Sequence, residues 1–238
     1  MKSKLGKLYD RTINDEKFLL EKISTNEKLF IGSLTDVNKF LAFYSMFVEN
    51  DFKKAKQYFY NSALISLYSI RKYDAPFYTN IYSICYALLS DNEFIINKFS
   101  RLEKENNTQI MGKLFIQNIQ NVLIGNNDNL DIENLNKLLN KKPQGLNGLD
   151  SFFLGLRNLN SGKIKSSIEQ LISNHGKRGE LELYKDYFSF EITCLMKLAW
   201  RQGLEVEVNS PLVPKEILPI EPLDNYEIPY DFLKDEIS

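Results

Sequence analysis

The 238-residue sequence contains few of the side chains from which metal and nucleophile sites are built, since it has one histidine, His175, and two cysteines. Cys85 and Cys194 are 109 positions apart within apolar helical patterns, which is typical of buried side chains in a reducing compartment rather than of a disulfide framework. His175 stands in a basic, glycine-bearing loop with neither cysteine near it in sequence, so we expect a solvated loop residue. We therefore predict no metal ligands, no cofactor and no catalytic residues.

Long apolar runs are also missing from the sequence. No uninterrupted apolar stretch approaches the roughly 18 to 20 residues that a membrane-spanning helix requires. The N-terminal residues Met1 to Lys7 are basic, but no apolar stretch of the kind found in export signals follows them. We expect a soluble, cytoplasmic protein with no membrane partner.

Phosphate-binding motifs are absent in any recognisable form. The nearest approach runs from Gly155 to Lys163, but it has six residues between its glycines where a phosphate loop has four, and Ile164 replaces the required Ser or Thr. The basic loop from His175 to Arg178 has no nearby aromatic residue, which favours an exposed turn over a phosphate contact. Because the formal net charge is only −1, we expect no direct binding of nucleic acid.

A high apolar content with helical periodicity is what the sequence does have. Hydrophobic residues make up 43% and aromatic residues 13%, so the chain can fold around a core without cross-links. Apolar residues recur at steps of three and four, which predicts an all-α protein. Asp74, Asp131 and Ser161 are candidate helix starts, and Gly203 is a candidate helix end. The expected helices are 10–30, 35–49, 52–72, 76–89, 93–104, 108–124, 131–140, 148–160, 163–174 and 181–202.

The breaks between these helices recur at similar intervals. Taking Asn50, Asp91, Asn126 and Ser161 as markers gives spacings of 41, 35 and 35 residues. Stacked αα-hairpins produce such spacings, because each hairpin buries its apolar face against the next. The pattern predicts a solenoid-like helical array over residues 1–202; an irregular bundle with fortuitously placed loops is the alternative.

Residues 203–238 differ from the rest of the chain. They contain five of the seven prolines, so a continuous helix is excluded, and they hold nine acidic but two basic residues. Residues 204–208 form a single short alternating run, and many apolar residues follow it. We predict an extended segment that packs on the helical domain with its acids outward; a disordered tail is the alternative.

The net charge of this segment is −7, whereas residues 1–202 carry +6. Acidic residues concentrated in this way can attract a basic partner. They can equally neutralise the basic body without meeting a partner, and the sequence leaves both readings open. The candidate partner-binding residues are Glu205, Glu207, Glu216, Glu221, Asp224 and Glu227.

The C-terminal 40 or so residues contain four distinctive elements. These are a helix ending near Gly203, a short acidic strand expected at Glu205 to Val208, a Ser-Pro-x-Val-Pro-x-Glu element at Ser210 to Glu216 and a closing Pro-Tyr-x-Phe-Leu at Pro229 to Leu233. In this combination they resemble the end of the immunity protein 49 family of bacterial polymorphic toxin systems. The rest of the chain agrees with the family in length and helical character.

The resemblance implies an immunity protein that binds and neutralises a cognate secreted toxin, often a nuclease, by direct contact. Nuclease domains carry basic surfaces because they bind phosphate, so an acidic docking face would suit such a toxin. Two other classes remain open. One is a helical-repeat scaffold that binds peptides in a groove, and the other is an enzyme with a carboxylate-based site, which the scarcity of histidine disfavours.

Overall fold

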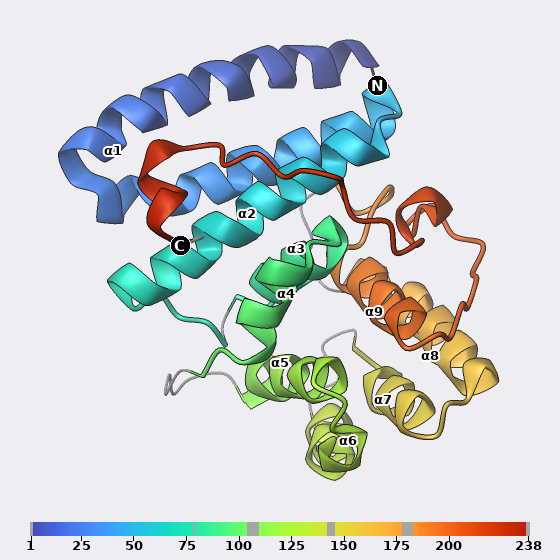
Figure 1. The fold of residues 1–238 in the computed structure, drawn as a ribbon. Coiled ribbons are helices and arrows are strands. Elements are labelled where there is room, and N and C mark those ends of the chain that lie inside the picture. Colours follow the sequence, from blue (N-terminus) through green and yellow to red (C-terminus); the bar gives the residue numbers. More distant parts are fainter. Residues whose placement is uncertain (1, 79, 104–109, 142–145, 178–182, 237–238) are drawn as a thin grey trace. The chain divides into compact units, whose positions relative to one another are not determined.

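The computed structural model describes residues 2–78, 80–103, 110–141, 146–177 and 183–236, and all the regular structure in these ranges is helical (Figure 1). This confirms the all-α fold class. None of the described helices combines the length and the hydropathy that crossing a bilayer would require. The helices are α1 (Lys2–Tyr44), α2 (Phe52–Tyr73), α3 (Tyr82–Ser90), α4 (Glu93–Ser100), α5 (Ile110–Leu123), α6 (Ile132–Lys141), α7 (Leu149–Arg157), α8 (Ser161–Asn174) and α9 (Phe190–Arg201).

The chain forms two compact units. The first comprises Met1–Phe77, Tyr86–Phe99 and Glu221–Ser238, and the second comprises Tyr78–Cys85 and Ser100–Ile220. The C-terminal segment that the sequence sets apart from the helical body, residues 203–238, is shared between the units, with residues 203–220 in the second and 221–238 in the first.

In the first unit, α1 consists of two segments that meet at Asn26, whose backbone is not helical (φ −151°, ψ 80°). The sequence placed this break near residues 30–35, so the expected boundary was several residues too late. The Asn26 side chain accepts a hydrogen bond from the Leu29 amide, as a residue at a helix start does. The first segment (residues 2–25) folds back along the second segment (residues 27–44), and α2 follows after a π-helical turn at Ser45–Glu49 (Figure 1).

The centre of the first unit is α2. Every residue from Phe59 to Ile70 is buried, including Asn61, Ser62 and Ser66. The sequence indicated one apolar stripe on this helix, but the structure surrounds it on all sides. Asp51 caps its start by accepting a hydrogen bond from the Lys54 amide at 2.9 Å. A central helix with polar residues on a buried face requires partners for them, and these partners come from α1 and the C-terminal segment.

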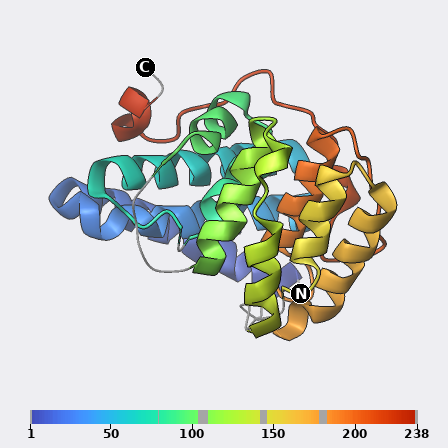
Figure 2. The same ribbon diagram turned by 90° about the horizontal axis from the view of Figure 1, so that it is seen from below.

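In the second unit, α6, α7 and α8 each pack against the helix that follows, and α9 also packs against α5 (Figure 2). This helix-on-helix arrangement confirms the predicted helical array. The breaks expected near Asn126 and Ser161 are present, and the turns contain residues with left-handed backbones, Gly125 (φ 75°) and Leu159 (φ 49°). Glycine adopts such a backbone without strain, whereas leucine does not.

Several expected helix boundaries were wrong in detail. Asp74 is the left-handed residue that ends α2 rather than the start of a helix, and α3 begins only at Tyr82. Asn160, not Ser161, caps α8, because its side chain accepts a hydrogen bond from the Lys163 amide. Asp131 does cap α6, and α9 ends two residues before Gly203 (φ 74°), as predicted. Residues 104–109 and 178–182, which fall within or beside three expected helices, lie outside the described ranges.

Candidate functional site

The described part of the C-terminal segment, residues 203–236, carries all six predicted partner-binding acids. It has no strand, since residues 204–208 have no regular structure, and its regular structure is limited to short 3₁₀ turns at Lys215–Ile217 and Asp231–Glu236. An unpaired chain rich in proline has few backbone hydrogen bonds, so its carbonyl groups need donors from side chains. Helices α9 and α2 supply these donors.

In the second unit, α9 holds the segment through two polar side chains. Thr193 donates from Oγ1 to the Leu212 carbonyl at 3.2 Å. Lys197 is fully buried, and its Nζ donates to the Pro219 carbonyl at 2.7 Å and to the Leu218 carbonyl at 3.4 Å. A buried ammonium group is stable only with such partners, so this lysine fixes the backbone just before residue 220.

In the first unit, a buried ion pair holds the segment at Glu221. Lys56 of α2 and Asp91 of the turn between α3 and α4 are 2.8 Å apart, with side chains 4% and 0% exposed. Lys56 also donates to the Glu221 carbonyl at 2.8 Å, and the Glu221 amide donates to Asp91 at 3.2 Å. The backbone of Glu221 thus contacts both charges, while its own side chain remains exposed.

The backbone of Glu227 is fixed by Gln57 of α2. The Gln57 side-chain amide donates to the Glu227 carbonyl at 2.9 Å, and its oxygen accepts from the Glu227 amide at 3.0 Å. These two bonds imitate the paired bonds between neighbouring strands. Gln57 also donates to Asn61 at 2.7 Å, which continues the network into the interior.

The network ends at Tyr230. Asn61 donates to Asn38 at 3.0 Å, and Asn38 donates to the Tyr230 hydroxyl at 2.9 Å. The Tyr230 hydroxyl donates in turn to Glu16 of the first α1 segment at 2.6 Å. Burial, followed by the Glu16 hydrogen bond, raises the pKa of Tyr230 well above its usual value, so this hydroxyl stays a donor. Residues from both α1 segments, α2 and the C-terminal segment are thereby linked.

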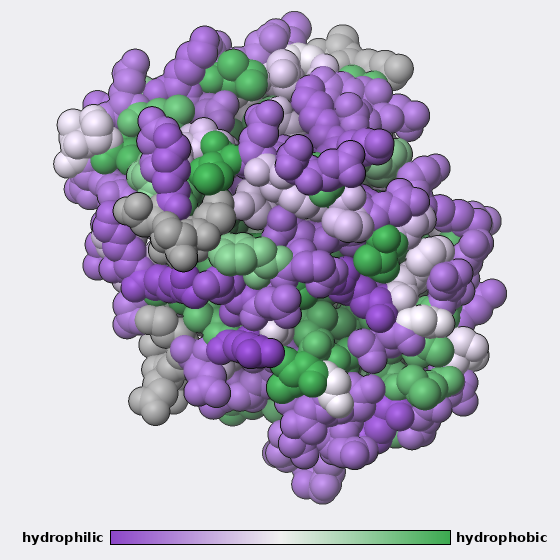
Figure 3. Space-filling model, viewed as in Figure 1, coloured by the Kyte–Doolittle hydropathy of each residue, from purple (hydrophilic) through white to green (hydrophobic). Residues whose placement is uncertain are grey.

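All six predicted acids are exposed. They form two groups: the Glu205 group (Glu205, Glu207 and Glu216) lies in the second unit, and the Glu221 group (Glu221, Asp224 and Glu227) lies in the first. Val206 and Val208 are buried between the exposed acids of the first group, which explains the alternating sequence without a sheet. Glu207 pairs with Lys215 at 3.2 Å, on the surface. The face drawn in Figure 3 is largely hydrophilic, with isolated hydrophobic residues.

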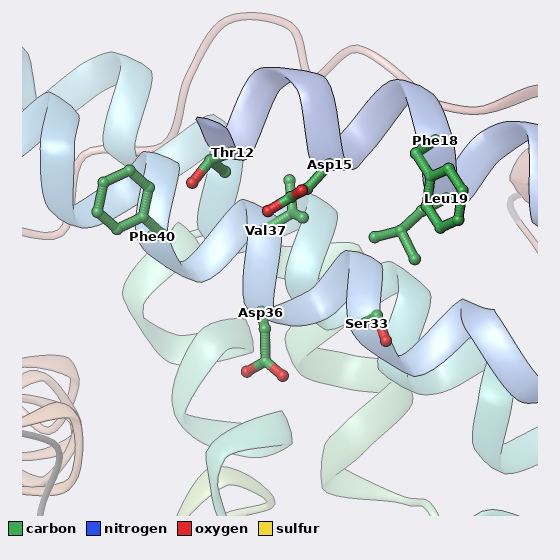
Figure 4. Close-up of a pocket in the computed structure, with 8 residues that line it drawn as sticks. All are labelled: Thr12, Asp15, Phe18, Leu19, Ser33, Asp36, Val37 and Phe40. Carbon is green, nitrogen blue, oxygen red and sulfur yellow. The ribbon is translucent and has the colours of Figure 1, made fainter. Parts of the chain in front are cut away.

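A hollow that the sequence did not indicate lies between the two segments of α1 (Figure 4). We call it the α1 groove, and its volume is about 360 Å³. In Figure 4, Leu19 and Asp15 point from the first segment toward the second, where Val37 lies, and Asp36 points away at the outer rim. The residues that line it are Thr12, Asp15, Phe18, Leu19, Ser33, Asp36, Val37 and Phe40.

Two residues considered for chemistry proved to have structural roles. His175 is 3% exposed, so the expectation of a solvated loop residue was wrong; it follows directly on α8 and is buried with it. Gly155 lies in α7, and a Cβ there would be 2.8 Å from the Ile164 side chain of α8. That glycine permits close helix packing, in agreement with rejecting it as part of a phosphate loop. The other two basic residues of the His175 loop cannot be placed in the same way, because Arg178 and the side chain of Lys177 lie outside the described part of the chain.

The two cysteines lie together although they are distant in sequence. Both are buried in the second unit and neither forms a disulfide. Burial and a hydrogen bond with the Cys194 side chain raise the pKa of the Cys85 thiol well above its usual value, so it stays protonated and unreactive. In the part of the chain that the structure describes, no three or more His, Cys, Asp or Glu side chains form a group that could hold a metal ion.

Comparisons with protein-family models, with curated proteins and with solved structures found no match to this chain. The functional argument therefore depends on the geometry above. Two of the residues that carry the C-terminal resemblance act in this structure as anchors, since Val213 is 1% and Leu233 0% exposed.

Proposed function

We propose that this protein acts in the cytoplasm as an immunity protein, which binds and neutralises a cognate secreted toxin by direct contact. The toxin would present a basic surface, as a nuclease does. The observation that supports this most is the presentation of the acids: their side chains are exposed, while buried anchors and side-chain hydrogen bonds fix the backbone that carries them. A backbone that is already held in place loses little conformational entropy when a partner binds the side chains that it carries.

The arrangement also bears on the alternative in which these acids only neutralise the basic body. Of the six carboxylates, Glu207 has a surface ion pair, and its partner Lys215 belongs to the same segment. An exposed pair of this kind contributes only about 0–1 kcal/mol to stability. Outward charges that stabilise the fold so little are better suited to attracting a partner, which increases the association rate at low ionic strength.

The test is co-expression with the toxin domain encoded beside this chain, followed by affinity purification and a growth-rescue assay. We expect co-purification and rescue. The Glu205 group and the Glu221 group would each be changed to lysine in separate variants, and each should weaken binding at least tenfold if its group contacts the toxin. A matched control changes Asp128, Glu169 and Asp186, which are exposed acids outside the segment, to lysine. If both acidic-group variants bind the toxin as tightly as the unmodified chain, while their melting temperatures are lowered, acidic docking is refuted.

A helical-repeat scaffold is the second candidate, and the helical array of the second unit favours it. A scaffold would bind a peptide of the host's own machinery and would not protect cells from the neighbouring toxin. Stable purification with a host protein, together with no rescue, would support the scaffold over the immunity function.

A further inference from the structure

We draw no further inference here: the strongest candidate, the hollow of about 850 Å³ beside α5 in the second unit, carries nothing, because the described residues that line it include as many basic as acidic side chains (Arg101 and Lys113, Glu103 and Asp131) and nothing in the structure shows what covers it.

Discussion

Lys56 and Asp91 form an ion pair of 2.8 Å in which both side chains are buried, and the backbone of Glu221 contacts both of them. Removing one member of such a pair leaves an uncompensated charge in the interior, which typically costs about 3–5 kcal/mol. We expect Lys56→Met to lower the free energy of unfolding by that amount, measured by urea denaturation. Lys54→Met is the matched control, because Lys54 pairs with Glu49 on the surface and should cost about 1 kcal/mol or less. Equal effects in the two variants would contradict the structure.

The Tyr230 hydroxyl joins Asn38 to Glu16, so Tyr230→Phe should weaken the attachment of the C-terminal segment while preserving its packing. Leaving buried hydrogen-bonding groups without a partner costs about 1–3 kcal/mol. The variant should therefore unfold more easily by that amount, and limited proteolysis should cleave the segment faster. Tyr187→Phe changes an exposed tyrosine and should have no measurable effect. Unchanged protection of the segment in Tyr230→Phe would show that the Tyr230 hydroxyl is not needed to hold it.

Replacing two helical glycines, Gly112 and Gly32, by alanine should change the stability of the protein in opposite directions. A Cβ at Gly112 of α5 would be 2.0 Å from the Tyr78 carbonyl oxygen, which forces the backbone apart. At Gly32 of α1 a Cβ would meet nothing within 4 Å. We expect Gly112→Ala to destabilise by about 1–3 kcal/mol through overpacking, and Gly32→Ala to stabilise by about 0.5–1 kcal/mol through helix propensity. Thermal unfolding of both variants checks this, and stabilisation by Gly112→Ala would exclude the close contact.

The pH dependence of stability should include a contribution from Glu27. Burial raises its pKa, but hydrogen bonds from Tyr68 and Lys72 outweigh burial and hold the pKa below its usual value. Because the folded-state pKa is lower than the unfolded one, the contribution is present above the unfolded pKa and is lost as the pH falls through the folded value. We expect Glu27→Gln to cost about 1 kcal/mol near pH 7. The difference from the unmodified protein should shrink as the pH falls below the unfolded pKa of about 4.3 and vanish below the lower folded pKa.

The hydrogen bond between Tyr68 and Glu27 should also affect the titration of Tyr68 at alkaline pH. Burial and the Glu27 hydrogen bond raise the pKa of Tyr68 to about 12. Stability from this group is complete below the unfolded pKa of about 10 and is lost as the pH rises toward the folded value. In Glu27→Gln, phenolate absorbance should therefore show Tyr68 titrating earlier than in the unmodified protein, together with Tyr73, whose pKa is raised by burial and also by Glu27. An unchanged titration curve would mean that Glu27 does not contact Tyr68 in solution.

The apolar periodicity determined that the chain is helical, and the polar breaks determined where most helices end. These features are local: Asp131 caps α6 and Gly203 follows α9 because short-range backbone requirements select those residues. The break in α1 was misplaced because Asn26 looks like any polar residue on a solvated helix face. The outward direction of the acids could also be predicted, since apolar residues alternate with them.

Only the tertiary structure decided which polar residues lie inside. Lys56 and Lys197 are buried because carbonyl groups of the proline-rich segment require donors, a demand that arises from residues some 20 to 170 positions away. A lysine within an apolar helical run was the available sequence signal, but periodicity alone assigns lysine to solvent. The α1 groove likewise depends on how one helical segment folds back on another. Periodicity fixes the face that a helix buries, whereas the partner of that face depends on long-range packing.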